Sequence, residues 1–170
     1  MKLHTILIAA ATFALAACGT SAGGGVGAGP AAALAPLPWA GFYQKATEEF
    51  GEGRRDEAVT LFYVGQLRGR IIVQCMPVRP DAEPALFGSL NETVGRVMNE
   101  YAGGSPDGWA GAIDRALAFD QAHPDPNATG PECGAERERQ RQGLTQLRDQ
   151  IRANVEMIRR ERTERGLPNR

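Results

Sequence analysis

The side chains whose types suit chemistry in this 170-residue sequence are few. Three are the cysteines Cys18, Cys75 and Cys133, and His123 is the one histidine beyond position 4. A group of carboxylates spans the end of one predicted helix and the start of the next; its members are Glu48, Glu49, Glu52, Asp56 and Glu57. The thiol, imidazole and carboxylate groups of these residues are the candidates for catalysis, metal binding or covalent modification.

The carboxylates fit two interpretations. Two carboxyl groups held about 5–10 Å apart can cleave a glycosidic bond. Acidic residues are also favoured in the first turn of a helix, because they face the positive end of its dipole. The helix-dipole interpretation accounts for Asp56 and Glu57, so the sequence favours a non-catalytic protein over a hydrolase.

His123 is the one candidate base and histidine ligand beyond the leader. With Asp120 and Asp125 it could meet a divalent cation, and with a cysteine thiol it could form a nucleophilic pair. Polar residues of this kind are also common in loops beside proline, and residues 123–131 form such a loop. We therefore predict no metal, no cofactor and no catalytic residue.

Residues 1–17 have the three parts of an export signal. Lys2 gives the positive start, residues 5–14 form the apolar core, and small residues precede Cys18. The apolar core is too short to span a bilayer as a helix. The alternatives are an ordinary secretory signal and one that ends in covalent modification of Cys18.

Residues 15–18 read L-A-A-C and resemble the lipobox of bacterial lipoproteins. The resemblance implies that residues 1–17 are removed as a signal peptide and that Cys18 becomes the lipid-bearing N-terminus. Several acyl chains hold a protein at a bilayer more firmly than one. Because Gly19 rather than an aspartate follows, the same resemblance implies a location at the outer membrane, facing the periplasm.

Residues 18–37 consist almost entirely of Gly, Ala, Ser and Pro and carry no charge. Such a composition cannot bury enough apolar surface to offset the entropy of ordering the chain. The segment is therefore predicted to be a flexible tether with a reach of about 25 Å. A tether of this kind would hold a folded domain away from the membrane surface.

Once Cys18 is assigned to the lipid, Cys75 and Cys133 form an even pair. In an oxidising periplasm two such thiols form a disulfide more often than they bind metal or react. Closing the loop between them would stabilise the fold by about 4 kcal/mol in the chain-entropy model.

Charge is distributed unevenly, although the formal net charge is only −1. Residues 134–170 contain 10 arginines and 6 acidic residues, whereas the preceding body is acidic on balance. The basic end either binds an anionic partner or complements the acidic body. We assign residues 38–133 to a helical body and residues 134–170 to a charged helix packed on it. The small net charge gives no indication of nucleic-acid binding.

The apolar spacing predicts an all-α fold, a bundle of about five helices. Glycines separate the first two helices and end the third, and Ser105 and Pro106 open the fourth as cap and first helical residue. Ile71-Ile72-Val73 either extends the second helix or forms a short strand. The predicted helices cover residues 39–50, 56–72, 86–101, 106–122 and 135–165, with a proline-rich loop at 76–84.

The first two predicted helices together resemble a single tetratricopeptide-type hairpin. The similarity lies in small residues at close-packing positions, a glycine in the turn and aromatic side chains: Ala46, Phe50, Gly53, Ala58, Phe62 and Gly65. No second copy follows at a spacing of about 34 residues, so an array of repeats is not predicted.

Leu144, Leu147 and Ile151 belong to a narrow apolar seam along the last predicted helix. The seam either docks on the core of the same domain or pairs with a partner helix as a coiled coil. These three side chains are therefore the candidate partner-binding residues.

The sequence predicts a non-catalytic binding or scaffolding lipoprotein of the cell envelope. It would be attached to the membrane through Cys18 and would have an unidentified envelope protein as its partner. The alternatives are a hydrolase that acts on the cell wall and an immunity-type lipoprotein that blocks a toxin in the periplasm.

Overall fold

Helices α2 (Trp39–Gly51) and α3 (Arg55–Cys75) form a hairpin in the computed structural model, which describes residues 33–76 and 82–170. Gly53 closes the turn with a φ of +87°, a conformation that suits glycine. The two helices approach closely at Gly65, where an added Cβ would lie 2.9 Å from the Cβ of Phe42. Residues 71–73 continue α3 as helix.

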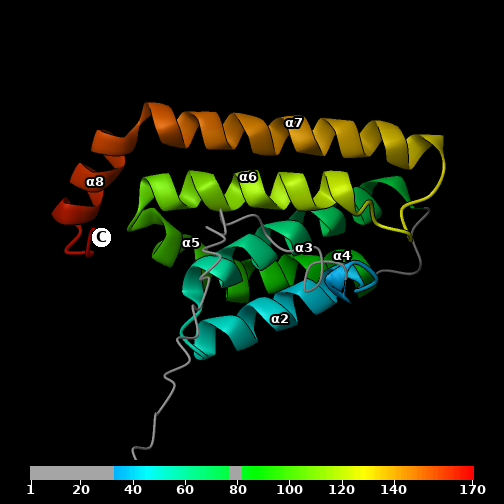
Figure 1. Cartoon of the computed structure of the whole chain (residues 1–170), viewed down its shortest axis with the longest axis horizontal. Helices are drawn as coiled ribbons and strands as arrows, with labels where there is room; N and C mark the ends of the chain where they lie inside the picture. Colours follow the sequence, from blue (N-terminus) through cyan, green and yellow to red (C-terminus); the bar gives the residue numbers. More distant parts are fainter. Residues whose placement is uncertain (1–32, 77–81) are drawn as a thin grey trace, which may run out of the picture.

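Helix α3 is buried along most of its length and occupies the centre of the fold. It packs against α2 and also against α6 (Pro106–Ala122) and α7 (Pro131–Ala153), which lie side by side in Figure 1. Edge-to-face aromatic contacts link α2 to α3, as where the ring centres of Tyr43 and Phe62 lie 5.5 Å apart. The apolar stripes predicted on these helices therefore meet in one core.

Helices α4 (Ala82–Leu90) and α5 (Arg96–Gly103) are joined by a π-helical turn, η1 (Asn91–Gly95), into one continuous rod. Asn91 holds this turn in place. Its Oδ1 accepts hydrogen bonds from the Tyr43 hydroxyl at 3.1 Å and from Gln66 Nε2 at 2.8 Å.

The rod begins earlier than the third predicted helix, because Pro84 lies in the first turn of α4 rather than in a loop. Proline is tolerated there, since the N–H groups of a first helical turn have no partner within the helix. Helix α6 begins as predicted, with Ser105 as the N-cap residue and Pro106 as the first helical residue. The Ser105 side chain makes no capping hydrogen bond.

The single terminal helix predicted over residues 135–165 is two helices. Helix α7 already begins at Pro131, and α8 (Val155–Glu164) follows it at a sharp angle in Figure 1. The break lies at Asn154, whose side-chain amide donates to the Gln150 carbonyl at 2.7 Å. Asparagine side chains compete with the helical backbone for hydrogen bonds in this way.

The described residues contain helices and turns without strands, which confirms the all-α prediction. From α2 to α8 there are six helices when the α4–η1–α5 rod is counted once. The break at Asn154 accounts for the helix beyond the five that were predicted.

The predicted signal peptide, Cys18 and most of the predicted tether lie in residues 1–32, outside the described residues. The last part of the predicted tether, residues 33–37, is described. Leu34 and Leu37 in this part pack against the core. The helical domain therefore begins nearer to residue 33 than to residue 38.

Candidate functional site

Arg68 of α3 is a charged side chain that is fully buried in the core. Its guanidinium lies between two aromatic rings, with Cζ 4.8 Å from the ring centre of Phe42 and 5.4 Å from that of Phe119. Burial lowers the pKa of Arg68. Because an arginine stays protonated in a protein, the core contains a permanent positive charge.

The donors of Arg68 point to three backbone carbonyl groups. Nη1 donates to the carbonyl oxygens of Ala35 at 3.0 Å and Leu37 at 3.1 Å, and Nη2 donates to that of His123 at 2.7 Å. Ala35 and Leu37 precede α2, and His123 follows α6. One guanidinium thus joins the segment that enters the domain to the end of α6. We call these four residues the Arg68 junction.

Two buried carboxylates offset part of the charge of Arg68, whereas Arg137 of α7 adds to the positive charge nearby. Asp125 and Asp120 both oppose the fall in the pKa of Arg68. Asp120 accepts a hydrogen bond from Arg141 Nη1 at 2.7 Å, and Asp125 accepts one from the backbone N–H of Asn127 at 2.9 Å. Because Arg141 belongs to α7, this helix contributes to the electrostatic environment of the Arg68 junction.

Farther along α7, two more arginines pair with α6. Arg148 Nη1 and Arg152 Nη2 lie 2.9 and 2.5 Å from the two carboxylate oxygens of Asp114. Together with Arg141, they support the interpretation in which the basic C-terminal segment complements the acidic body.

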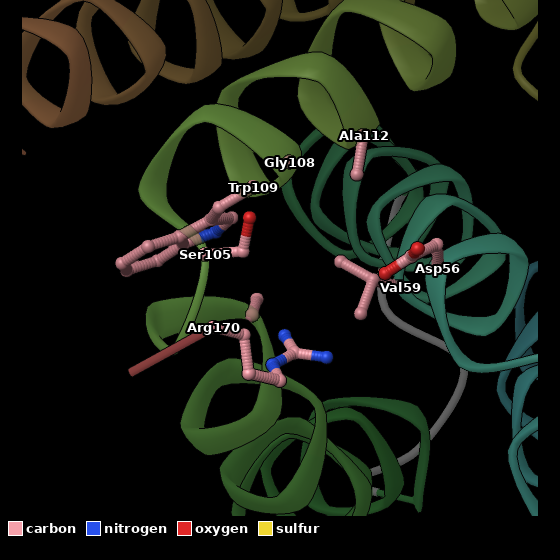
Figure 2. Close-up of a pocket in the computed structure, with 8 residues that line it drawn as sticks. Asp56, Val59, Ser105, Gly108, Trp109, Ala112 and Arg170 are labelled. Atoms are coloured by element: carbon pink, nitrogen blue, oxygen red, sulfur yellow. The ribbon is translucent and has the colours of Figure 1, made fainter. Parts of the chain in front are cut away.

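A small pocket opens where the start of α3 meets the end of α5 and the start of α6 (Figure 2). Its volume of about 10 Å³ is about the room that one water molecule needs. The lining residues are Asp56, Val59, Ala102, Ser105, Gly108, Trp109, Ala112 and Arg170.

Arg170 forms one wall of this pocket and stacks on Tyr101, with Cζ 3.5 Å from the ring centre. Its Nη2 donates to the Tyr101 carbonyl at 2.6 Å, and its backbone N–H donates to the Gly104 carbonyl at 2.6 Å. The Tyr101 hydroxyl in turn donates to Asp56 Oδ1 at 3.1 Å. A carboxylate beside an aromatic face suits a cation, and Arg170 of the same chain supplies one.

A chain of hydrogen bonds begins at Trp109 beside the pocket. The Trp109 indole N–H donates to the Tyr63 hydroxyl at 2.6 Å, and that hydroxyl donates to Asn99 Oδ1 at 2.8 Å. Burial raises the pKa of Tyr63 to about 12. The Tyr63 hydroxyl therefore stays neutral at physiological pH and links α3, α5 and α6 as a structural group.

Three of the five carboxylates that the sequence grouped together share two basic side chains. Lys45 pairs with Glu48 and Glu49, and Arg54 pairs with Glu49 and Glu52. Glu49 is buried, lies 2.7 Å from Lys45 and pairs with Arg54, whereas Asp56 bonds to Tyr101. Hydrogen bonds from Arg54 and Lys45 lower the pKa of Glu49 to about 2. The acid of a glycosidase needs a raised pKa, so Glu49 is unsuited to that role.

The candidate metal-binding residues also have separate environments. The Asp120 side chain is bonded to Arg141, the Asp125 side chain to Asn127, and the His123 ring lies beside Phe119. Within residues 33–76 and 82–170, no three side chains of His, Cys, Asp or Glu are placed to hold a metal ion together.

The side chains of Leu144, Leu147 and Ile151 pack within the helical domain. Leu144 and Ile151 are buried in the core, and the half-buried Leu147 packs against it. Of the two predicted arrangements of the seam, the structure therefore has the one in which the seam packs on its own domain, because α7 contacts α3 and α6. Leu144 and Ile151 are therefore core residues rather than an exposed surface for a partner helix, and Leu147 is the one of the three that is partly exposed.

Cys75, at the end of α3, and Cys133, in the first turn of α7, form a disulfide, as predicted. The bond ties the end of the central helix α3 to the start of α7.

Sequence reasoning missed Arg68, although a signal was present. Leu61, Val64, Arg68 and Ile71 follow one another at spacings of three or four residues, so the arginine falls on the apolar stripe of its helix. A charge at such a position predicts a buried group that needs polar partners inside the protein.

No family model, curated protein or solved structure matches this chain. In the part of the chain that the structure describes, no helix has the length and apolarity to cross a bilayer.

Proposed function

We propose that this chain is a lipid-anchored protein of the bacterial cell envelope, attached through Cys18, whose helical domain binds or scaffolds another envelope component without catalysis. The observation that carries the proposal is the lipobox-like sequence L-A-A-C at residues 15–18, and the Arg68 junction shows how the segment that follows it joins the domain. A buried charge in the centre of the fold holds the segment that leads back toward Cys18.

The junction suits an anchored domain because it fixes where the chain leaves the fold. Residues 19–32 separate Cys18 from the docked segment. These 14 residues span at most about 50 Å when fully extended. A lipid on Cys18 would therefore keep the docked segment within about 50 Å of the membrane.

The non-catalytic part of the proposal is supported by the pairing of the acidic side chains. Glu49 is bonded to Arg54 and Lys45, and Asp120 is bonded to Arg141. Ion pairs of this kind have a structural role in the domain. They leave Glu49 ionised at the pH values where a glycan-cleaving acid must hold a proton.

The anchor is tested by replacing Cys18 with alanine in the full chain, expressed in a bacterium with a functional lipoprotein pathway. The matched control is the double variant Cys75→Ala/Cys133→Ala, which keeps Cys18 and removes the other two thiols. We expect C18A to lose fatty-acid labelling and to leave the membrane fraction, and the control to keep both. Labelling of C18A at the level of the parent chain would refute the anchor.

The scaffolding role is tested by photo-crosslinking in intact cells. A photoreactive residue is placed at exposed positions on different helices, such as Gln44 of α2 and Gln146 of α7. A scaffolding protein gives a discrete heterologous adduct from one face of the domain. A chain that gives no adduct from any exposed face does not bind an envelope protein.

A further inference from the structure

Two consecutive glycines at the end of α5, Gly103 and Gly104, make room for two arginines. A Cβ atom on Gly103 would lie 3.0 Å from Arg162 Nη1, and one on Gly104 would lie 3.0 Å from Arg170 Nε. Gly104 has a φ of −65°, which any residue can adopt. The close approach of the arginines, rather than the backbone conformation, therefore favours glycine at the end of α5.

Three features at the end of α5 suit a guanidinium group. The Tyr101 carbonyl, at the negative end of the helix dipole, accepts a hydrogen bond of 2.6 Å from Arg170 Nη2. The Tyr101 ring offers an aromatic face 3.5 Å from Arg170 Cζ. The Asp56 carboxylate and the Arg170 guanidinium lie on facing sides of the pocket in Figure 2. A flat cation that stacks on its face and donates from its edge fits this arrangement better than an ammonium group.

The segment that carries Arg170 is held by few other contacts with the rest of the domain. From residue 165 to residue 170 no side chain is buried. The hydrogen bonds described for residues 166–169 all run to α8, as where Arg162 Nη2 donates to the Pro168 carbonyl at 2.9 Å. A segment with so little buried surface opens locally at low cost. Arg170 is therefore an occupant that can leave the end of α5 while the helical core stays folded.

We propose that the end of α5 is a binding site for an arginine side chain, which Arg170 occupies until an arginine-bearing segment of the partner protein replaces it. The inference rests on the binding role proposed above and names the chemistry of the partner. It does not depend on the lipid of Cys18. The incoming guanidinium stacks on Tyr101, donates to the Tyr101 carbonyl and faces Asp56, as that of Arg170 does.

The test uses the full chain with the substitution Arg170→Ala, purified in detergent. The probe is the peptide Gly-Leu-Pro-Asn-Arg, which has the sequence of residues 166–170 and carries blocking groups at both ends. Its control peptide has citrulline, a neutral isostere, in place of arginine. The readout is the NMR resonance of the Trp109 indole N–H, because Trp109 lines the pocket. The other tryptophan, Trp39, is buried in the core and serves as the internal reference.

We expect R170A to shift the Trp109 resonance, and the arginine peptide to return it toward its position in the parent chain while the Trp39 resonance stays unchanged. The citrulline peptide should have no effect. The parent chain should need a several-fold higher concentration of the arginine peptide, because its own Arg170 competes. No response in R170A, or an equal response to both peptides, would overturn the arginine site. An equal response of R170A and the parent chain would overturn its occupation by Arg170.

A second substitution tests the site itself. Gly104→Ala in the R170A chain places a Cβ atom where the guanidinium docks and should abolish the response to the arginine peptide. The matched control is Gly88→Ala in the same chain, because an added Cβ at Gly88 meets nothing within 4 Å. A response that survives G104A would place the peptide elsewhere and overturn the proposal. Failure of the arginine site leaves the binding role itself to the crosslinks from Gln44 and Gln146, so the two failures are distinguishable.

Discussion

The Arg68 guanidinium, fully buried in α3, donates a hydrogen bond of 3.1 Å to the backbone carbonyl of Leu37. Leu37 is the last residue of the segment that its composition predicts to be a free tether. The bond turns the end of that segment into part of the domain. Because the same guanidinium also holds the His123 carbonyl at 2.7 Å, the entry of the chain and the end of α6 depend on one side chain.

Replacing Arg68 with leucine is expected to destabilise the domain strongly. The substitution removes the donor from three carbonyl groups and takes away one of the positive charges near the buried carboxylates Asp120 and Asp125. Breaking a buried charge network of this kind lowers the free energy of unfolding by about 3 kcal/mol or more. Chemical denaturation followed by circular dichroism measures the loss.

The control for Arg68 is Arg70→Ala, two positions along the same helix and exposed. Its free energy of unfolding is expected to stay within about 0.5 kcal/mol of the parent value. If R68L and R70A proved equally mild, the junction would not hold the entering segment.

Arg68 and the apolar seam of α7 show which structural features can be predicted from the pattern of residue types and which cannot. The helical spacing around Arg68 places it on a buried face, but no sequence pattern gives the three carbonyl groups that accept hydrogen bonds from Nη1 and Nη2, because they come from segments far from Arg68 in the chain. The seam of Leu144, Leu147 and Ile151 is visible in the sequence as apolar. Whether such a seam packs in its own domain or on a partner depends on where α3 and α6 lie, which the seam itself does not encode.

Arg141→Met is expected to destabilise the domain because it removes the hydrogen-bond donor of the buried Asp120 carboxylate and leaves only the more distant Arg137, at 3.9 Å, paired with it among the described residues. The expected loss is about 3–5 kcal/mol, measured by denaturation of the purified protein. The exposed Arg160 of α8 serves as the matched control, and R160M should have a small effect. The double variant D120N/R141M should be less destabilised than the sum of its parts, since it removes both charges. Additive effects would mean that the two side chains do not interact.

Removing the Cys75–Cys133 disulfide is expected to lower the free energy of unfolding by about 2–5 kcal/mol. The double variant C75S/C133S and the parent chain treated with a reducing agent should lose the same amount. The reducing agent should leave the double variant unchanged, which controls for effects on the rest of the chain. A parent protein whose unfolding midpoint is the same with and without reductant would contradict the pairing.

Other differences between prediction and structure have local causes. Pro84 was assigned to a loop because proline breaks helices, but the first turn of α4 accommodates it. Asn154 lies among apolar residues whose spacing continues through it, yet its side chain bonds to the Gln150 carbonyl and ends α7. By contrast, Ser105 and Pro106 were placed correctly, because a proline that starts a helix is a strictly local signal.

The stabilising effect of Glu49 should depend on pH. Its pKa is lowered from 4.5 to about 2 in the folded chain by Arg54 and Lys45. The contribution is therefore fully present above about pH 4.5 and is lost as the pH falls toward 2. Glu49→Gln should be less stable than the parent at pH 7, and the difference should shrink below pH 4.5 in urea titrations. Glu57→Gln, at an exposed position, is the control. A difference that stayed constant down to pH 2.5 would contradict the ion pairing.

The mass of the mature protein, extracted from the bacterial envelope and measured intact, tests the central claim most directly. A lipid-anchored domain predicts a chain that begins at Cys18 and carries the added mass of a diacylglyceryl group on that residue. Proteolysis should place this mass on the N-terminal peptide, separate from the peptide pair linked through Cys75 and Cys133. A chain with an unmodified Cys18, or one that begins elsewhere, would contradict the account.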